Sequence, residues 1–273
     1  MKKTLSALLI LFSFAAARAQ VVVAPTILFM SDQSRFGTFV VMNRSNTPQE
    51  IGVSFKFGFP ESDSLGNITM NYNDSLMAQE HSCESWLRGF PQKFILNPGQ
   101  QQVVRLLASP PAGIQDGEYW TRLITSSTPQ AKTIDTVRSG ITANITFVLQ
   151  QVTTVIFKKG YVNTSVQIQG LVSEQDSTSM NLMADVARGG NSPFFGRMSA
   201  VVKDHAGNTV YTNQQVLAIY QNKMVVKFPV PLSDLRSGSY TADFKLESER
   251  TDIPGEDMIK IPTVEKSFAF RME

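Results

Sequence analysis

Reactive and cross-linking side chains are scarce in this chain of 273 residues, which holds one cysteine, Cys83, and two histidines, His81 and His205. A single cysteine excludes a disulfide within the chain, so a packed hydrophobic core must stabilise the fold. No Cys/His spacing typical of a metal site occurs, and we expect no bound metal. His205 lies in a polar segment typical of a solvated turn, and we interpret Cys83 as a free, half-buried thiol.

Motifs for catalysis and for cofactor binding are absent as well. The sequence holds no G-x-x-x-x-G-K-[ST] phosphate loop, no G-x-G-x-x-G dinucleotide loop and no G-x-S-x-G nucleophile turn. Its acidic residues are scattered, and no pair of them has the arrangement of a general acid and base. We therefore expect no catalytic residues and no cofactor, although distant residues can assemble a site that no motif reveals.

Only one long apolar run occurs, and it lies at the start of the chain. Lys2 and Lys3 precede the run Leu5–Ala17, and an A-x-A sequence comes directly before Gln20. This order is typical of a cleaved secretory signal, and the run is too short to span a bilayer as an anchor. We predict a signal peptide at residues 1–19 and a mature chain that is exported without membrane insertion.

A strong charge of either sign is also lacking. Removal of the three basic residues of the signal peptide changes the formal net charge from +2 to −1. No stripe of lysine and arginine stands out, so nothing favours a nucleic-acid partner.

Alternating apolar and polar residues are abundant. The segments 51–57, 180–186 and 240–246 each place apolar side chains at every second position, which is typical of strands with one face in a core. Turn-forming clusters separate such segments. Helical spacing is found only over residues 75–87. We predict an all-β fold of two immunoglobulin-like (Ig-like) β-sandwich domains in tandem.

The domain boundary is expected after one unusually long strand, Ile141–Lys158. Charge and glycine interrupt the strand pattern at Lys158–Gly160, and the mature length suits two domains of about 100–150 residues each. We place the first domain at residues 20–158 and the second at 161–273.

The segment before this strand carries a resemblance to a known family. Residues 91–105 follow the pattern P-x-x-x-x-L-x-P-G-x-x-x-x-V-R, in which Asn97–Gly99 forms a turn between two strands. A D-x-E strand follows at Asp116–Glu118. This order resembles the N-terminal domain of the PapD-like periplasmic chaperones of pilus and fimbrium assembly. The resemblance implies two Ig-like domains, a periplasmic location and exported β-rich protein subunits as partners.

In that family, alternate apolar residues of the long strand are lent to an incomplete subunit by donor-strand complementation. The resemblance assigns this role to Ile145, Phe147 and Leu149. Alternating apolar residues usually face the core of their own domain, and the sequence alone leaves both interpretations open.

Two departures concern the cleft between the domains. The family uses an arginine and a lysine there to hold the carboxylate at the end of the subunit, and the matching positions of this chain are Ile27 and Thr154. Neither side chain supplies a cation for a carboxylate. The resemblance also implies an interdomain charge cluster of Glu118, Lys158 and Asp243. The alternative is that these are three solvated surface charges.

Two functions therefore compete. The first is a periplasmic chaperone for pilus-type subunits. The second is a secreted or cell-surface structural or adhesive module, which the missing cations favour. A long exposed apolar strand also predicts self-association of the free protein.

Overall fold

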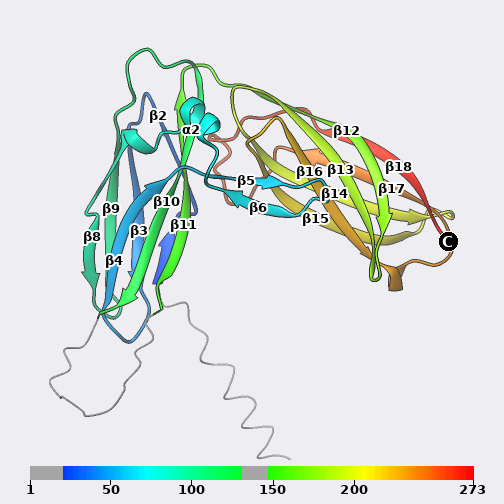
Figure 1. Cartoon of the computed structure of the whole chain (residues 1–273), viewed down its shortest axis with the longest axis horizontal. Helices are drawn as coiled ribbons and strands as arrows, with labels where there is room; N and C mark the ends of the chain where they lie inside the picture. Colours follow the sequence, from blue (N-terminus) through cyan, green and yellow to red (C-terminus); the bar gives the residue numbers. More distant parts are fainter. Residues whose placement is uncertain (1–20, 131–146) are drawn as a thin grey trace, which may run out of the picture.

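Two β-sandwich domains, set at a steep angle to each other, make up the molecule (Figure 1). The structure, a computed structural model, describes residues 21–130 and 147–273. The predicted signal peptide and the predicted donor residue Ile145 lie outside these residues. The all-β prediction is confirmed, because strands dominate both domains. None of the helices in the described residues is long and apolar enough to cross a membrane.

Two packed sheets form the first domain. One has the order β1-β3-β9-β7, and the other has the order β2-β11-β10-β4-β8. Their bounds are β1 Val21–Ala24, β2 Ile27–Ser31, β3 Phe36–Asn43, β4 Gln49–Lys56, β7 Leu87–Phe90, β8 Lys93–Leu96, β9 Gln101–Ala108, β10 Gly117–Pro129 and β11 Leu149–Lys159. The inner faces bury a core that includes Phe39, Leu106, Leu123 and Phe157. The turn predicted at Asn97–Gly99 joins β8 to β9, with Gly99 at a φ of 77°.

The second domain repeats this architecture with a core of its own. Its sheets have the orders β12-β13-β16 and β15-β14-β17-β18. Their bounds are β12 Thr164–Gln175, β13 Ser179–Gly190, β14 Phe194–Asp204, β15 Thr209–Ile219, β16 Lys223–Pro231, β17 Gly238–Glu247 and β18 Val264–Met272, with a short 3₁₀ turn η2 at Leu232–Asp234. Phe228 and Phe244 meet between the two sheets, with their ring centroids 5.8 Å apart.

A third apolar cluster joins the domains. Trp120 and Ile156 of the first domain and Tyr220 of the second are almost fully buried in it. The rings of Trp120 and Tyr220 have their centroids 4.9 Å apart. This contact is built like a small core, so it supports one preferred arrangement of the two domains.

The helical prediction for residues 75–87 is only partly right. Helix α2 spans Ser75–His81 and begins where the Asp74 carboxylate accepts the Met77 N–H at 3.0 Å. A 3₁₀ turn, η1, follows at Glu84–Trp86. Leu87 is not helical, because it begins strand β7 and pairs with Ala108 of β9.

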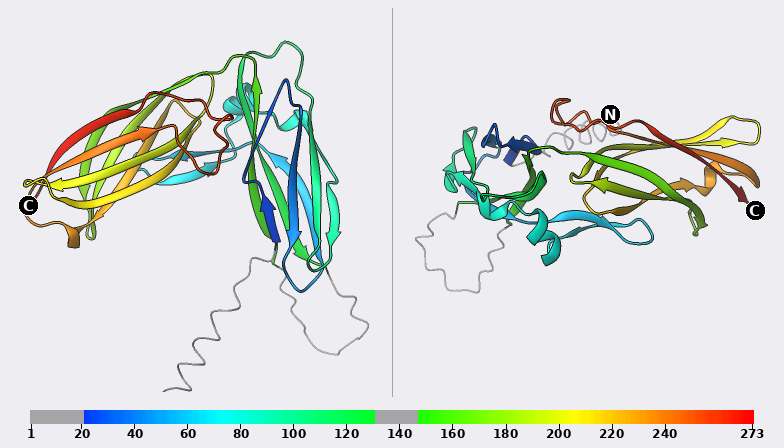
Figure 2. Two further views of the ribbon diagram at one scale, coloured as in Figure 1. Left: turned by 180° about the vertical axis from the view of Figure 1, so that it is seen from behind. Right: turned by 90° about the horizontal axis from the view of Figure 1, so that it is seen from above.

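A two-stranded hairpin departs from both sandwiches. It consists of β5, Phe59–Ser62, and β6, Ile68–Asn71, which pair with each other. The hairpin leaves the first domain after β4 and extends beside the second domain (Figures 1 and 2).

Candidate protein-binding site at the open strand and the domain junction

Strand β11 has one face directed into the core of the first domain. Phe157 and Val155 are fully buried on this face, and Thr153 is 2% exposed. Alternation places Leu149 on the same face, yet Leu149 is 42% exposed, and Phe147, two residues earlier, is 80% exposed. The core-facing row of β11 therefore continues beyond the point at which the domain covers it.

The same part of β11 has an open edge. Strand β10 pairs with β11 from Leu149 to Lys159 on one side. On the other side, β2 pairs in parallel only from Thr154 to Lys158. Strand β1 contacts β11, but within the described residues no strand forms a ladder with this side between Leu149 and Thr153. Backbone groups there can therefore pair with an added strand.

One detail of the long-strand prediction is wrong. The sequence pattern placed Phe147 within a strand from Ile141 to Lys158, but β11 begins at Leu149, and Phe147 and Val148 precede it. The pairing with β10 ends at Leu149, which removes the partner that would keep Phe147 in a ladder. Of the predicted donor residues, Leu149 thus begins β11 and Phe147 lies two residues before it.

The two predicted cleft residues lie side by side. Thr154 of β11 is the direct register partner of Ile27 on the parallel strand β2. Both line a cavity of about 340 Å³ whose other walls include Phe195, Ala218 and Tyr220 of the second domain. Ile27 and Thr154 therefore lie together where residues of both domains meet.

An arginine that the sequence analysis did not single out lies in the same cavity. Arg122 on β10 is the register partner of Thr154, and its guanidinium donates to the Thr154 hydroxyl. Its Nε donates to the Gly58 carbonyl at 2.9 Å, and its guanidinium carbon lies 5.0 Å from the centre of the Tyr220 ring. Arg122 is 5% exposed, so it is a desolvated cation, and its contacts with Thr154, Gly58 and Tyr220 hold it in place.

Two further side chains complete this polar end of the cavity. The Tyr220 hydroxyl is buried, which raises its pKa, while the neighbouring Arg122 acts in the opposite direction. Arg250 lies across the cavity and is already paired with Asp252, with 2.7 Å between Nε and Oδ1. Arg122 is therefore the cation in this cavity that has no carboxylate partner within hydrogen-bonding distance among the described residues.

Glu118 and Lys158 occupy a second polar region at the junction. They are register partners on β10 and β11. Glu118 is 2% exposed, and its carboxyl accepts the Ser192 hydroxyl of the second domain at 2.6 Å. Burial raises the pKa of Glu118 to about 7, and the hydrogen bond from Ser192 and the charge of Lys158 act to lower it.

The third member of the predicted charge cluster is elsewhere. Asp243 lies on β17, where it accepts from Lys203 at 2.8 Å and from Ser267 at 2.6 Å. Both partners belong to the same sheet of the second domain, so the structure does not bring Asp243 to Glu118. The acidic residue of the second domain that acts on both Glu118 and Lys158 is Asp257, in the loop before β18. That loop has no alternating apolar pattern, so the sequence did not point to Asp257.

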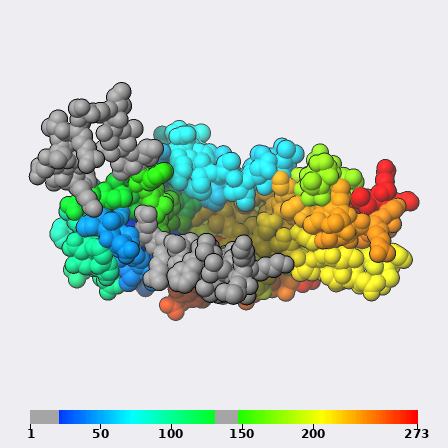
Figure 3. Space-filling view, turned by 90° about the horizontal axis from the view of Figure 1, so that it is seen from below, coloured from blue at the N-terminus to red at the C-terminus, as the bar shows by residue number. Residues whose placement is uncertain are grey.

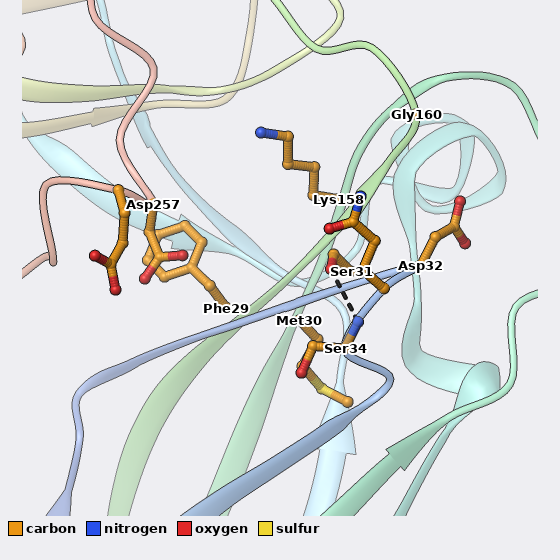
Figure 4. A pocket seen from close by; sticks show the side chains of 10 residues that line it. Phe29, Met30, Ser31, Asp32, Ser34, Lys158, Gly160 and Asp257 are labelled. Atoms are coloured by element: carbon orange, nitrogen blue, oxygen red, sulfur yellow. Dashed lines mark hydrogen bonds between the residues drawn. The ribbon is translucent and has the colours of Figure 1, made fainter.

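Lys158 and Asp257 face each other across a cavity of about 600 Å³ (Figure 4). Its other lining comes from the end of β2 and the turn that follows, where the Ser34 N–H donates to the Ser31 hydroxyl at 3.1 Å. Burial and the adjacent Glu256 raise the pKa of Asp257. The charges at this junction therefore come from both domains.

Cys83 and His81 are both packed against neighbouring side chains. Cys83 is fully buried rather than half-buried as predicted, and burial raises the pKa of its thiol. His81 stacks on Trp120 with 4.7 Å between ring centroids, and burial lowers its pKa. The buried Cys83 thiol therefore lacks the exposure of a reactive nucleophile.

Comparison with known proteins gives matches in structure only. No protein-family model matches the sequence, and no curated protein matches it. Among solved structures, the chain is similar to the YadV chaperone, with 10% identity, 92% of this chain and 100% of that chain covered, and a TM-score of 0.47.

Two further similar structures are complexes. One is the CsuC–CsuE chaperone–tip adhesion subunit complex of Acinetobacter baumannii, with 13% identity, 90% of this chain and 98% of that chain covered, and a TM-score of 0.48. The other is the SafA pilin with the SafB chaperone of Salmonella enterica, with 13% identity, coverage of 94% and 99%, and a TM-score of 0.46. Each of these structures contains a chaperone, and in the two complexes the chaperone is bound to a tip adhesion subunit or to a pilin.

Proposed function

We propose that this protein is a periplasmic chaperone that binds exported β-rich subunits by lending them strand β11. The observation that carries this proposal is the uncovered continuation of the core-facing row of β11, from buried Val155 to exposed Leu149 and Phe147. An incomplete β-sandwich has an unpaired strand edge and an open core. The free edge of β11 offers backbone pairing, and its apolar side chains offer filling for that core.

The test is to express residues 20–273 with an affinity tag in the periplasm of the native host and to identify co-purifying proteins by mass spectrometry. We expect a stoichiometric β-rich exported protein, and we expect its loss in the Phe147→Asp variant. Because Phe147 is 80% exposed, this variant keeps its fold, which circular dichroism checks. Partner-free protein at the cell surface would instead favour the structural or adhesive module.

We further infer that Arg122 supplies the cation for the client's terminal carboxylate, a role that Ile27 and Thr154 cannot fill. Its guanidinium lies in the cavity with both residues and, among the described residues, has no carboxylate within hydrogen-bonding distance. Arginine offers five N–H donors in a planar fork, so bonds to Gly58 and Thr154 leave donors for a ligand.

Two substitutions of Arg122 separate the effect of its positive charge from the effect of its planar guanidinium group. We expect Arg122→Lys to weaken capture of the co-purifying protein and Arg122→Met to weaken it further. Lys203→Met is the control, because Lys203 is paired with Asp243 away from the cavity. Equal capture by all three variants would remove Arg122 from the binding site.

We propose that the domains meet at Lys159–Tyr161. Gly160 has a φ of 55°, and a Cβ there would collide with the Asp116 carboxylate, which also accepts the Tyr161 N–H at 3.0 Å. Asn191 of the second domain donates to the Tyr161 carbonyl at 3.0 Å. This position is one or two residues from the boundary that the sequence indicates.

The free protein is proposed to self-associate through the open part of β11. Phe147, Val148 and Val152 are all exposed apolar side chains near that edge. Sedimentation distinguishes monomer from dimer in the wild-type protein and in the Phe147→Asp variant. We expect a concentration-dependent dimer only for the wild type. A monomer at high concentration contradicts this proposal and leaves the chaperone function open to its own test.

A further inference from the structure

The β5–β6 hairpin connects the two domains without belonging to either sandwich. It belongs by sequence to the first domain, between β4 and α2, but it lies along β16 of the second (Figure 1). The space-filling view shows this segment, in cyan, running from the first domain onto the second (Figure 3).

The tip of the hairpin is bonded to β16 at two points. The Val225 N–H donates to the Ser62 hydroxyl at 2.7 Å, and Lys227 Nζ donates to the Asn67 side-chain oxygen at 2.7 Å. Gly66 has a φ of 73°, and a Cβ there would lie 2.7 Å from Lys227 Cβ. The turn of the hairpin therefore fits closely against one strand of the second domain.

The base of the hairpin is anchored in the junction cluster. Phe59, the first residue of β5, is fully buried. Its ring packs against Phe57 of the first domain and Tyr220 of the second, with centroid distances of 5.8 and 6.3 Å. Both ends of the hairpin thus contact the second domain, so the hairpin resists rotation of one domain against the other.

The strand that the hairpin contacts has an otherwise open edge. Strand β16 ends the sheet β12-β13-β16, and within the described residues no second strand forms a ladder with it. The Val225 N–H points to that edge, where the Ser62 hydroxyl takes the place of a ladder acceptor. Covering such an edge protects it from unwanted strand pairing.

The hairpin also forms part of the wall of the cavity that holds Arg122. Pro60 and Met70 of the hairpin and the adjoining Tyr72 line that cavity together with Thr154 and Arg122. The position of the hairpin therefore sets the width of the cleft between the domains.

We propose that the β5–β6 hairpin is a strap that fixes the angle between the two domains and thereby the shape of the cleft. Removing the two hydrogen bonds between the hairpin and β16 widens the range of angles between the domains, while the contact of Phe59 with Tyr220 remains. This inference goes beyond the proposed function, and its test needs no partner protein.

The test compares two double variants of the full mature chain. Ser62→Ala with Lys227→Met removes both contacts between the hairpin and β16. Ser239→Ala with Lys203→Met is the matched control, because Ser239 is an exposed residue of β17 and Lys203 pairs with Asp243 inside the second domain. Circular dichroism and thermal unfolding verify that both variants keep their fold.

Two measurements report on the strap. We expect the test variant to show a broader small-angle scattering distance distribution and about tenfold faster hydrogen exchange at the Val225 amide, the effect of losing two hydrogen bonds. The control should match the wild type in both. Unchanged scattering in the test variant would overturn the proposal even if Val225 exchanges faster, because Ser62→Ala removes the acceptor of that amide directly.

Discussion

At the scale of single residues, Glu118 is the side chain whose burial has the clearest measurable consequence. Its pKa of about 7 in the folded protein lies above the ordinary value of 4.5, so the folded state holds the proton more tightly than the unfolded state. The stability contributed by the neutral carboxyl is complete below pH 4.5 and is lost as the pH rises to about 7. Ionisation at higher pH costs on the order of 3 kcal/mol.

Glu118→Gln isolates this contribution, because an amide accepts the Ser192 hydroxyl but does not titrate. We expect the variant to equal the wild type in unfolding free energy near pH 4.5 and to exceed it by about 2–3 kcal/mol at pH 8. Urea unfolding at the two pH values measures the difference. A constant difference across this range would mean that Glu118 is already ionised, with Lys158 as its partner.

Cys83 gives a second prediction at this scale. Its thiol is fully buried and its pKa is raised, so thiolate is scarce and inaccessible in the native state. We expect a thiol-specific reagent to label the protein only after denaturation. Labelling of the native protein at the rate of a free cysteine would show that the cluster around Cys83 opens readily.

At the scale of elements, the two ends of β11 differ in what they stabilise. Phe157 is buried in the first core, so Phe157→Ala should lower the unfolding free energy by about 3–5 kcal/mol. Phe147 is 80% exposed, and Phe147→Asp should change it by less than about 0.5 kcal/mol. Urea titrations of both variants test this, and a large loss of stability for Phe147→Asp would place Phe147 in the core.

The sequence was sufficient for most strands, because a period of two is a local signal. The stripes at 180–186 and 240–246 lie within β13 and β17. Contacts that depend on how strands are paired could not be predicted from the sequence. Arg122 is one of two charged residues on β10, and only its pairing with Thr154 shows that it enters the cleft. Asp257 lies in a loop, where no periodicity points to a partner.

The hairpin shows a similar limit. Residues 59–71 contain turn-forming residues and no long apolar stripe, which indicates a surface loop. The role of this segment depends on Ser62 and Asn67 contacting a strand more than 150 positions away. Such contacts are fixed by the tertiary structure, and a local pattern does not record them.

At the scale of the whole molecule, the two domains meet through an apolar cluster, a buried carboxyl and the β5–β6 hairpin. The open part of β11 lies in the first domain, and Arg122 lies in the cavity at the junction. A client that pairs with β11 is therefore positioned to reach Arg122 with its chain end. The proposed binding site combines a strand edge, which pairs with any extended backbone, with a cation suited to the carboxylate of a chain end.

Hydrogen exchange of the free and the partner-bound protein tests most directly whether a partner pairs with β11. We predict that binding slows exchange of backbone amides between Leu149 and Thr153, while amides of β17, far from the edge, keep their rates. Protection elsewhere on the surface, with unchanged exchange from Leu149 to Thr153, would contradict donation of this strand.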